Sequence, residues 1–250
     1  MKILAIDTSS KVCSVAITED MEKIIEIHSD DEKTHSVKLM PMIDEAFKAV
    51  NLSLDDINLL VCSVGPGSFT GVRIGVSTIK AFADVKSIPV IGVSSLESLA
   101  YNMIDKSVPI MQLSNTLFCS IIDAKNNNVY CGLYRYYNNC LNQITDLIAD
   151  DIETVVSKIN TTINTFNNQF NNVTFVGDGS SIYMDLLKKE LSSANVNLSF
   201  ADQNQSIANS VSIATAGYLK YINGSYGDSS VLSPLYLRKS QAERALEGKK

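Results

Sequence analysis

The sequence has few of the residues that bind metal ions or form disulfide bonds. Of its 250 residues only two are histidines, His28 and His35, and none is tryptophan. Neither histidine has another histidine or a cysteine four residues away, and the zinc motif His-Glu-x-x-His is absent. The five cysteines are an odd number without a Cys-x-x-Cys pair, so we expect reduced and mostly buried thiols. These absences argue against a metal site and against a disulfide framework.

Long apolar runs are also missing. No stretch reaches the length needed to cross a membrane, and the apolar run at residues 1–6 is too short for a secretion signal. We therefore expect a cytoplasmic protein that has no membrane partner.

Basic residues are outnumbered by acidic ones. The chain has 21 lysines and arginines against 27 aspartates and glutamates, which gives a net charge of −6. A protein that holds nucleic acid on its own usually has a basic face, so we expect no dominant RNA-binding surface on this chain alone. The sequence still allows a local basic patch near the C-terminus, formed by Arg238, Lys239, Arg244, Lys249 and Lys250.

Three common catalytic motifs are absent as well. Residues 65–71 are rich in glycine but lack the Gly-Lys-Ser/Thr ending of a Walker loop, and they do not fit Gly-x-Gly-x-x-Gly. No Gly-x-Ser-x-Gly elbow occurs either. The sequence therefore gives no support to a P-loop nucleotidase, a dinucleotide-binding motif or a serine hydrolase.

The most distinctive stretch is Ser63–Gly75, which reads SVGPGSFTGVRIG. It follows an apolar run at residues 59–62 and opens a segment with helical spacing of apolar residues. A strand, a glycine-rich turn and a helix in this order place backbone N–H groups where an anion could bind. Equally, Gly67, Gly71 and Gly75 recur at every fourth residue and leave one helix face bare for another helix. Both interpretations, anion cradle and docking surface, stay open at this point.

The order of predicted elements is repeated along the chain. In residues 1–108 we expect strands at 2–6, 12–17, 23–28, 59–64 and 88–93, and helices at 34–50, 68–84 and 95–104. In residues 109–232 we expect strands at 116–123, 129–136, 140–147, 173–176 and 197–201, and helices at 151–160, 177–191 and 206–222. Both halves read βββαβαβα and begin with a strand that ends in aspartate. The sequence therefore predicts an α/β fold of two duplicated, RNase H-like domains, followed by a polar tail at 233–250.

A duplicated fold of this order resembles the actin-like, sugar-kinase and Hsp70 ATPase superfamily. There, an acidic turn after the first strand of each half faces a nucleotide in the cleft between the halves. The residues available for such a cleft are Asp7, Thr8, Ser9, Gly177 and Gly179. The alternative is that Asp7 and the neighbouring hydroxyls only cap a tight turn. The second turn, residues 123–126, has neither glycine nor hydroxyl, so we expect at most a vestigial nucleotide cleft.

Three motifs resemble the TsaB (YeaZ) family: Ile6–Ser9 (IDTS), Val64–Gly75 (VGPGSFTGVRIG) and Pro89–Glu97 (PVIGVSSLE). The end of the chain, Pro234–Lys239 (PLYLRK), fits this family too, so the resemblance covers nearly the whole chain. The resemblance implies a role in making threonylcarbamoyladenosine next to the anticodon of certain tRNAs. In that pathway a catalytic paralogue of the same fold transfers the threonylcarbamoyl group to N6 of the adenosine, and a small ATPase completes the complex. TsaB-like chains heterodimerise with the paralogue, so contact with tRNA is expected only through the complex.

The same resemblance implies that this chain is not catalytic. The paralogue has a metal-binding His-x-x-x-His just after a strand that ends in Gly-Val, and here Ser95 and Leu99 stand in these positions. A hydroxyl and an isobutyl group cannot hold a catalytic metal. We therefore expect no catalytic residue, no metal and no cofactor.

The helices expected at 34–50 and 68–84 form the predicted docking surface, because their small or flexible residues allow a partner helix to pack closely. The residues predicted for this interface are Met40, Met42, Phe47, Gly67, Ser68, Phe69, Gly71, Arg73 and Gly75. A homodimer held by the same helices is compatible with this prediction. The rival hypothesis is a stand-alone nucleotide-binding enzyme, either sugar-kinase-like or an ATPase.

Overall fold

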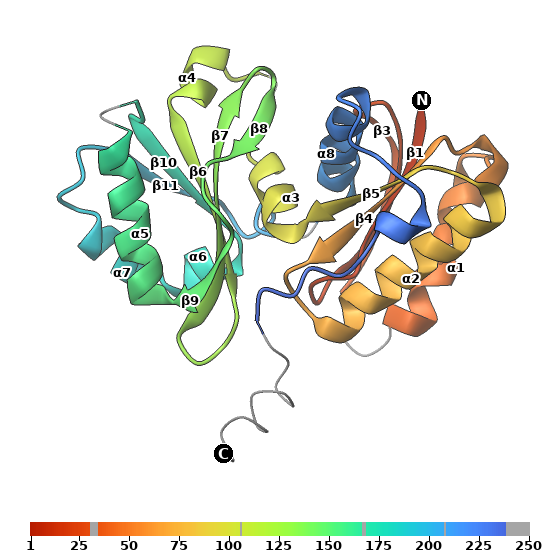
Figure 1. Cartoon of the computed structure of the whole chain (residues 1–250), viewed down its shortest axis with the longest axis horizontal. Helices are drawn as coiled ribbons and strands as arrows, with labels where there is room; N and C mark the ends of the chain where they lie inside the picture. The colour runs from red at the N-terminus through yellow and green to blue at the C-terminus, as the bar shows by residue number, and fades with distance from the viewer. Residues whose placement is uncertain (31–34, 106, 167–168, 208, 239–250) are drawn as a thin grey trace.

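The chain folds into two sheets, one in each half, with helices packed against both. The computed structural model describes residues 1–30, 35–105, 107–166, 169–207 and 209–238. Figure 1 shows the two sheets side by side, with the first half of the chain on the right and the second on the left.

The first half forms a five-stranded sheet with the order β3-β2-β1-β4-β5. Its strands are β1 (Lys2–Asp7), β2 (Cys13–Glu19), β3 (Glu22–Ser29), β4 (Leu59–Gly65) and β5 (Val90–Ser94). Its helices are α1 (His35–Ala49), α2 (Phe69–Lys86) and α3 (Ser95–Tyr101), with a short 3-10 turn, η1 (Leu54–Asp56). Strand β1 is antiparallel to β2 and parallel to β4, so a meander on one side joins helical crossovers on the other.

The second half repeats this arrangement in a sheet with the order β11-β10-β6-β7-β8. Its strands are β6 (Thr116–Asp123), β7 (Asn128–Tyr137), β8 (Cys140–Gln143), β9 (Ile148–Asp151), β10 (Asn172–Val176) and β11 (Asn197–Phe200). Its helices are α4 (Ile110–Ser114), α5 (Ile152–Thr165), α6 (Asp178–Ile182), α7 (Met184–Glu190) and α8 (Ser210–Ile222), followed by the 3-10 turn η2 (Ser229–Val231). In each sheet the first strand of the half is central, and the later strands parallel to it extend to one side. The predicted α/β fold and its duplication are therefore confirmed.

Some predicted elements are divided or new in the structure. The third strand expected at 140–147 is shorter and forms β8, and the additional strand β9 pairs with a different part of β7. The helix expected at 177–191 is interrupted at Tyr183, where φ is −105° and ψ is 17°, and becomes α6 and α7. Helix α4 has no counterpart in the prediction, because its five residues are too few to display a helical period.

Two helices cross between the halves. Helix α8 packs on β1, β2, β4 and β5 of the first sheet, while α3 also packs on β6, β7 and β8 of the second. Both lie between the two sheets in Figure 1. The core that they share contains Ile3 and Val61 from the first sheet and Phe118 and Tyr134 from the second. The packing joins the halves through α3 and α8, so it does not itself mark a boundary. We propose that the two repeated sequence units meet at 108/109.

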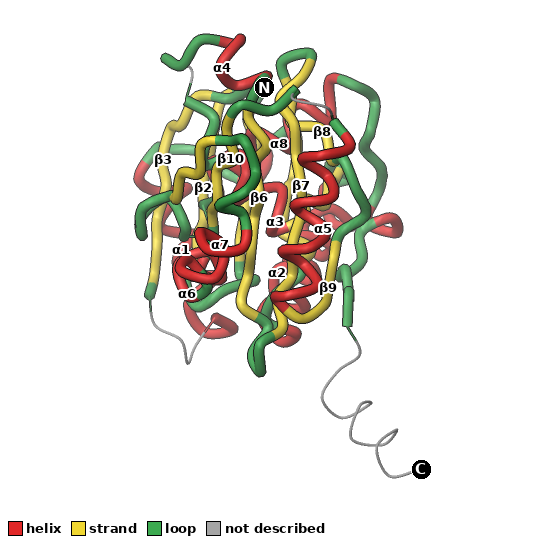
Figure 2. The backbone as a smooth tube through the Cα atoms, turned by 90° about the vertical axis from the view of Figure 1, so that its left-hand side faces the viewer, coloured by secondary structure: helices red, strands yellow, loops and turns green. Residues whose placement is uncertain are grey.

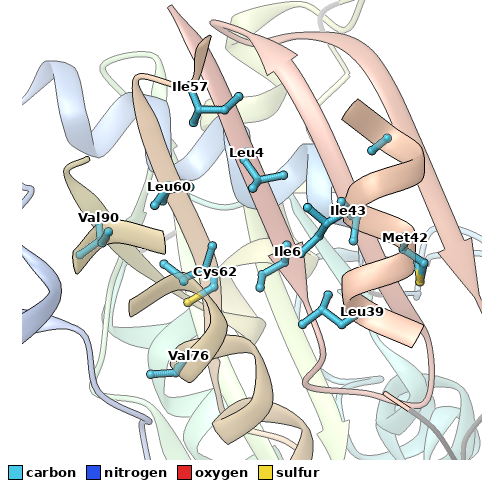
Figure 3. Packing of buried hydrophobic residues seen from close by; sticks show 14 of the residues in the cluster. Leu4, Ile6, Leu39, Met42, Ile43, Ile57, Leu60, Cys62, Val76 and Val90 are labelled. Atoms are coloured by element: carbon cyan, nitrogen blue, oxygen red, sulfur yellow. The ribbon is translucent and has the colours of Figure 1, made fainter. Parts of the chain in front are cut away.

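The outer side of each sheet is covered by helices that continue the apolar core. Figure 2 looks onto the second half, where α5 and α7 lie in front of the strands. In the first half, Leu39 and Ile43 of α1 point toward Ile6 of β1 (Figure 3), and Met42 belongs to the same core. Fully burying a side chain of this size stabilises the fold by roughly 1.5–3 kcal/mol. Burial on both faces explains why the central strands read as continuous apolar runs.

The C-terminal segment 225–238, which we call the strap, returns from α8 to the first half. Leu232 is only 2% exposed and belongs to the first core. The Leu235 N–H donates to the Val64 carbonyl oxygen at 2.7 Å. Figure 1 shows the strap in blue, passing over the first half beside α2. The first six residues of the predicted polar tail thus belong to the strap, and residues 239–250 lie outside the described part of the chain.

Candidate functional site

The glycine-rich start of α2 packs against the turn that follows β1. A Cβ atom at Gly67 would overlap the carbonyl oxygen of Ser9, and one at Gly71 would overlap that of Thr8. A Cβ at Gly75 would lie 2.5 Å from the Thr8 hydroxyl oxygen. The two segments are also bonded, since the Thr8 hydroxyl donates to the Gly71 carbonyl oxygen at 2.7 Å. Backbones approach this closely only where glycine removes the side chain.

This contact corrects the prediction for the three glycines. The spacing of Gly67, Gly71 and Gly75 predicts close packing, which the structure confirms, but the neighbour is the chain's own turn and not a partner helix. Four-residue spacing cannot tell an internal neighbour from an external one. Ser68, also predicted for the interface, is the N-cap of α2 and accepts the Gly71 N–H at 3.2 Å.

Two other predicted interface residues, Phe69 and Arg73, contact the strap. The rings of Phe69 and Tyr236 are stacked, with 4.9 Å between centroids and 10° between planes. Arg73 Nε donates to the Tyr236 hydroxyl at 2.7 Å, and Arg73 Cζ lies 5.5 Å from the tyrosine ring centroid. Phe69 and Arg73 are one helical turn apart and so share a side of α2. A residue 163 positions further along the chain therefore engages both, which no local pattern indicates.

On α1 the structure separates the three predicted interface residues. Met40 is 49% exposed, whereas Met42 is 5% exposed in the first core and Phe47 is half-buried against it. Val37, which is absent from the predicted interface, is 68% exposed and lies three residues before Met40 on the same side of the helix. The buried stripe of α1 consists of Leu39, Met42, Ile43 and Ala46. An apolar residue that falls outside this stripe is the signal that could have identified Val37.

The exposed side of α2 has one long cation followed by short side chains. Arg73, Ser77 and Ala81 recur at intervals of four residues, and all three are exposed. Helices α1 and α2 lie side by side on the same side of the first sheet (Figure 1). We call these exposed residues of the two helices, Val37 and Met40 of α1 and Arg73, Ser77 and Ala81 of α2, the α1–α2 face.

The predicted cleft residue Asp7 lies at the end of β1 and is only 1% exposed. Its Oδ1 accepts the Ser9 N–H at 2.7 Å. Burial raises the pKa of the Asp7 carboxyl above its ordinary value, and the hydrogen bonds from Ser9 and the charge of His35 oppose this only in part. With Thr8 bonded to α2, this arrangement favours the alternative in which the residues after β1 cap a tight turn.

In the second half, the turn that follows β6 contains a salt bridge between Lys125 and Asp123. Lys125 Nζ donates to Asp123 Oδ2 at 2.7 Å, and this hydrogen bond raises the pKa of Lys125 above its ordinary value. Gly177 and Gly179 pack on β6: a Cβ at Gly177 would overlap the Ile121 carbonyl oxygen, and one at Gly179 would lie 3.1 Å from it. The two glycines are thus used for internal packing, as the glycines of α2 are.

The positions at which the paralogue is expected to have histidines are buried between the halves. Ser95 Oγ lies 2.7 Å from Ser63 Oγ. Leu99 is 6% exposed and packs with Val176, and its Cδ1 would lie 3.2 Å from a Cβ at Gly177. Apolar packing therefore occupies the space between α3 and the second sheet. Among the residues that the structure describes, no three or more histidines, cysteines, aspartates or glutamates form a group that could hold a metal ion.

Two surface cavities lie away from these residues. They have volumes of about 350 and 440 Å³, and both are beside α5 in the second half. Separately, no helix within the described residues has both the length and the apolar character needed to span a bilayer.

Because α2 packs closely on the turn after β1, a single methyl group added at Gly71 should strongly destabilise the fold. Gly71→Ala should lower the free energy of unfolding by about 3 kcal/mol, because the new Cβ overlaps a backbone oxygen that cannot move freely. Urea denaturation measures this change. The neighbouring exposed Thr70→Ala is the control and should change stability by no more than about 0.5 kcal/mol. Equal stability of Gly71→Ala and the unaltered chain would show that the two backbones are not in contact.

The raised pKa of Asp7 predicts that Asp7→Asn stabilises the fold by an amount that depends on pH. Burial disfavours the charged carboxylate in the folded state but not in the unfolded state, so Asp7→Asn should increase the free energy of unfolding at pH 7. The gain should shrink as the pH falls through the native pKa toward about 4, the ordinary value for aspartate. Urea denaturation at neutral and acidic pH tests this, with the exposed Asp146→Asn as control. A loss of stability at pH 7 would mean that the charged carboxylate has a stabilising partner.

Comparison with known proteins connects this geometry to a family. The family model for TsaD, described as tRNA N6-adenosine threonylcarbamoyltransferase, matches residues 25–246. The TsaB protein of Bacillus subtilis is 37% identical over 157 residues, which cover 61% of this chain and 65% of that protein. The TsaB protein of Escherichia coli is 36% identical over 140 residues, which cover 56% of this chain and 57% of that protein. These matches span between half and two thirds of the length of the curated relatives.

Solved structures agree with the fold. YeaZ from Pseudomonas aeruginosa superposes with a TM-score of 0.75 at 21% identity, covering 94% of this chain and 99% of that one. The ROK hexokinase of Thermus thermophilus superposes with a TM-score of 0.52 at 10% identity, covering 90% of this chain and 100% of that one. Both likenesses concern the fold alone, which this chain shares with YeaZ and, more distantly, with the hexokinase. The chain belongs to the family that the TsaD model describes, and the curated relatives to which it is similar are TsaB proteins.

Proposed function

We propose that this chain is a non-catalytic subunit required for threonylcarbamoyl transfer to N6 of the adenosine next to the anticodon in tRNA. The Bacillus subtilis and Escherichia coli relatives are named as tRNA threonylcarbamoyladenosine biosynthesis proteins, and the matching family model is that of the transferase. The observation that carries the non-catalytic role is Leu99, which stands where the paralogue is expected to have a histidine and packs at Gly177.

The groups around this cleft support a role without catalysis. Transfer of an acyl group needs donors or cations aimed at the charge that develops in the transition state. Here the Asp7 carboxylate is buried, Asp123 is paired with Lys125, and the hydroxyls of Ser63 and Ser95 face each other. Each of these groups has a hydrogen-bond partner within the chain.

The α1–α2 face is the proposed docking surface for the catalytic paralogue. Val37 and Met40 expose apolar side chains on one helix, and covering them would remove that area from water. Ser77 and Ala81 on the other helix are short, so a partner helix can approach closely. We propose a heterodimer through this face, completed by a small ATPase subunit. A homodimer through the same face is the arrangement proposed when the paralogue is absent.

Contact with tRNA is proposed to occur through the complex. The net charge of −6 disfavours strong binding of a polyanion by this chain alone. A partner that carries the basic surface would supply the phosphate contacts. Since tRNA is the final substrate, we propose that the complex works in the cytoplasm.

A stand-alone sugar-kinase-like enzyme or ATPase is the rival function. It shares the fold, and it requires an open cleft with acidic residues free to hold a magnesium nucleotide. The pairing of Asp123 with Lys125 and the burial of Asp7 argue against it. Calorimetry of the isolated chain with ATP and magnesium separates the two functions, because tight, metal-dependent binding would support the rival.

The proposed subunit role predicts that the transfer reaction depends on the α1–α2 face. Met40→Glu should weaken binding to the paralogue by about tenfold or more, because it places a charge in an apolar contact. The melting temperature should stay unchanged, since Met40 is 49% exposed. Met111→Glu on α4 is the matched control, because Met111 is 77% exposed but lies in the second half.

Reconstituted transfer to tRNA is the functional measurement. We expect no product from the isolated chain, product from the full mixture, and little product when this chain is omitted or replaced by Met40→Glu. Normal transfer without this chain would contradict the subunit role. Normal binding by Met40→Glu would contradict only the location of the docking surface.

A further inference from the structure

The PLYLR motif near the C-terminus, residues 234–238, contacts both β4 and α2. Within it, the Leu235 N–H is bonded to β4, and Tyr236 follows directly. The Tyr236 ring lies flat on Phe69, and its hydroxyl accepts a hydrogen bond from Arg73 Nε at 2.7 Å. The strap thus fixes one side of the first turns of α2.

Arg73 is held at one end and open at the other. Its Nε is bonded to Tyr236, and the guanidinium lies 5.5 Å from the tyrosine ring centroid. Within the described part of the chain, no carboxylate lies within ion-pair distance of Arg73. Arg73 is exposed, so its two Nη groups remain available as a planar fork of donors. A guanidinium fixed through Nε loses less conformational freedom when a partner binds.

The open end of Arg73 belongs to the proposed docking surface. Arg73 is followed at four-residue intervals by Ser77 and Ala81, the short residues of the α1–α2 face. It also lies one turn from the start of α2, where the positive end of the helix dipole adds to its own charge. On a chain with a net charge of −6, this is a local cationic point at the edge of an apolar surface.

We propose that Arg73 is the polar anchor of this surface and takes a carboxylate of the docked partner, with Tyr236 as the residue that positions it. The inference rests on the proposed docking through the α1–α2 face and adds the chemistry of one contact. Planar, two-pronged recognition of a carboxylate is what a free guanidinium fork provides. Tyr236 acts through Arg73 and does not itself touch the partner's acid.

The test is a double-mutant cycle on the full chain, with binding to the catalytic paralogue measured by calorimetry in the absence of tRNA. Arg73→Gln should weaken binding by about tenfold. Tyr236→Phe keeps the ring stack but removes the hydroxyl, and should weaken binding by about threefold. In the Arg73→Gln background, Tyr236→Phe should have no further effect, because it acts only through Arg73. Higher salt should weaken binding of the unaltered chain more than binding of Arg73→Gln.

The control is Tyr226→Phe, in the same strap. Tyr226 is stacked on Tyr221 at 4.6 Å and is 53% exposed, but it does not contact Arg73. We expect unchanged binding from this variant, and unchanged melting temperatures from all single variants, since each keeps the packing of the strap.

The outcomes separate this inference from the function on which it rests. If the unaltered chain fails to bind the paralogue, the proposed function falls and this inference with it. If the unaltered chain binds and Arg73→Gln binds equally well, or if the two substitutions have independent effects, only the anchor assignment falls. If Arg73→Gln weakens the complex only when tRNA is present, Arg73 contacts a phosphate and the carboxylate assignment is overturned.

Discussion

The first half of the molecule depends on one close contact between two backbones, the turn after β1 and the first turns of α2. Thr8 and Ser9 present their carbonyl oxygens to positions occupied by Gly71 and Gly67, and the Thr8 hydroxyl bonds across the contact. A side chain at either glycine would separate the segments. This contact fixes which side of α2 faces the turn, and with it the direction of the other sides.

The orientation of α2 divides its surface among three neighbours. One side faces the turn, a second buries Val72 and Val76 in the core, and a third lies against Tyr236 of the strap. Tyr236 covers this third side only near Phe69 and Arg73, so Ser77 and Ala81 further along it are left exposed to solvent. In the second half, Gly177 and Gly179 likewise pack closely on β6, and Leu99 packs over Gly177. Leu99 and the two glycines therefore make internal contacts between the halves, while Val37, Met40, Ser77 and Ala81 are exposed on the outside.

The sequence allowed the architecture to be predicted better than the site. Apolar runs such as residues 59–62 identify strands buried on both faces, and the repeated element order identifies the duplication. The face of α1 was harder, because Val37 and Met40 fit a helical stripe as well as Leu39 and Met42 do, and only packing on the sheet selects between them. The glycine spacing was informative about distance but silent about the neighbour. The contact between Arg73 and Tyr236 joins residues 163 positions apart, and the crossing of α3 and α8 is set by the packing of both sheets, so no local pattern contains either.

Amide hydrogen exchange on the full chain, alone and with its catalytic paralogue, tests most directly whether the cleft is closed and the outside is the working surface. Docking on α1 and α2 would suppress local opening of these helices. We predict slower exchange in both helices when the paralogue is added, and unchanged exchange at residues 7–9 and 177–179 when ATP and magnesium are added to the chain alone. Slower exchange at residues 7–9 and 177–179 with ATP and magnesium, without any change in α1 and α2 on adding the paralogue, would contradict this picture.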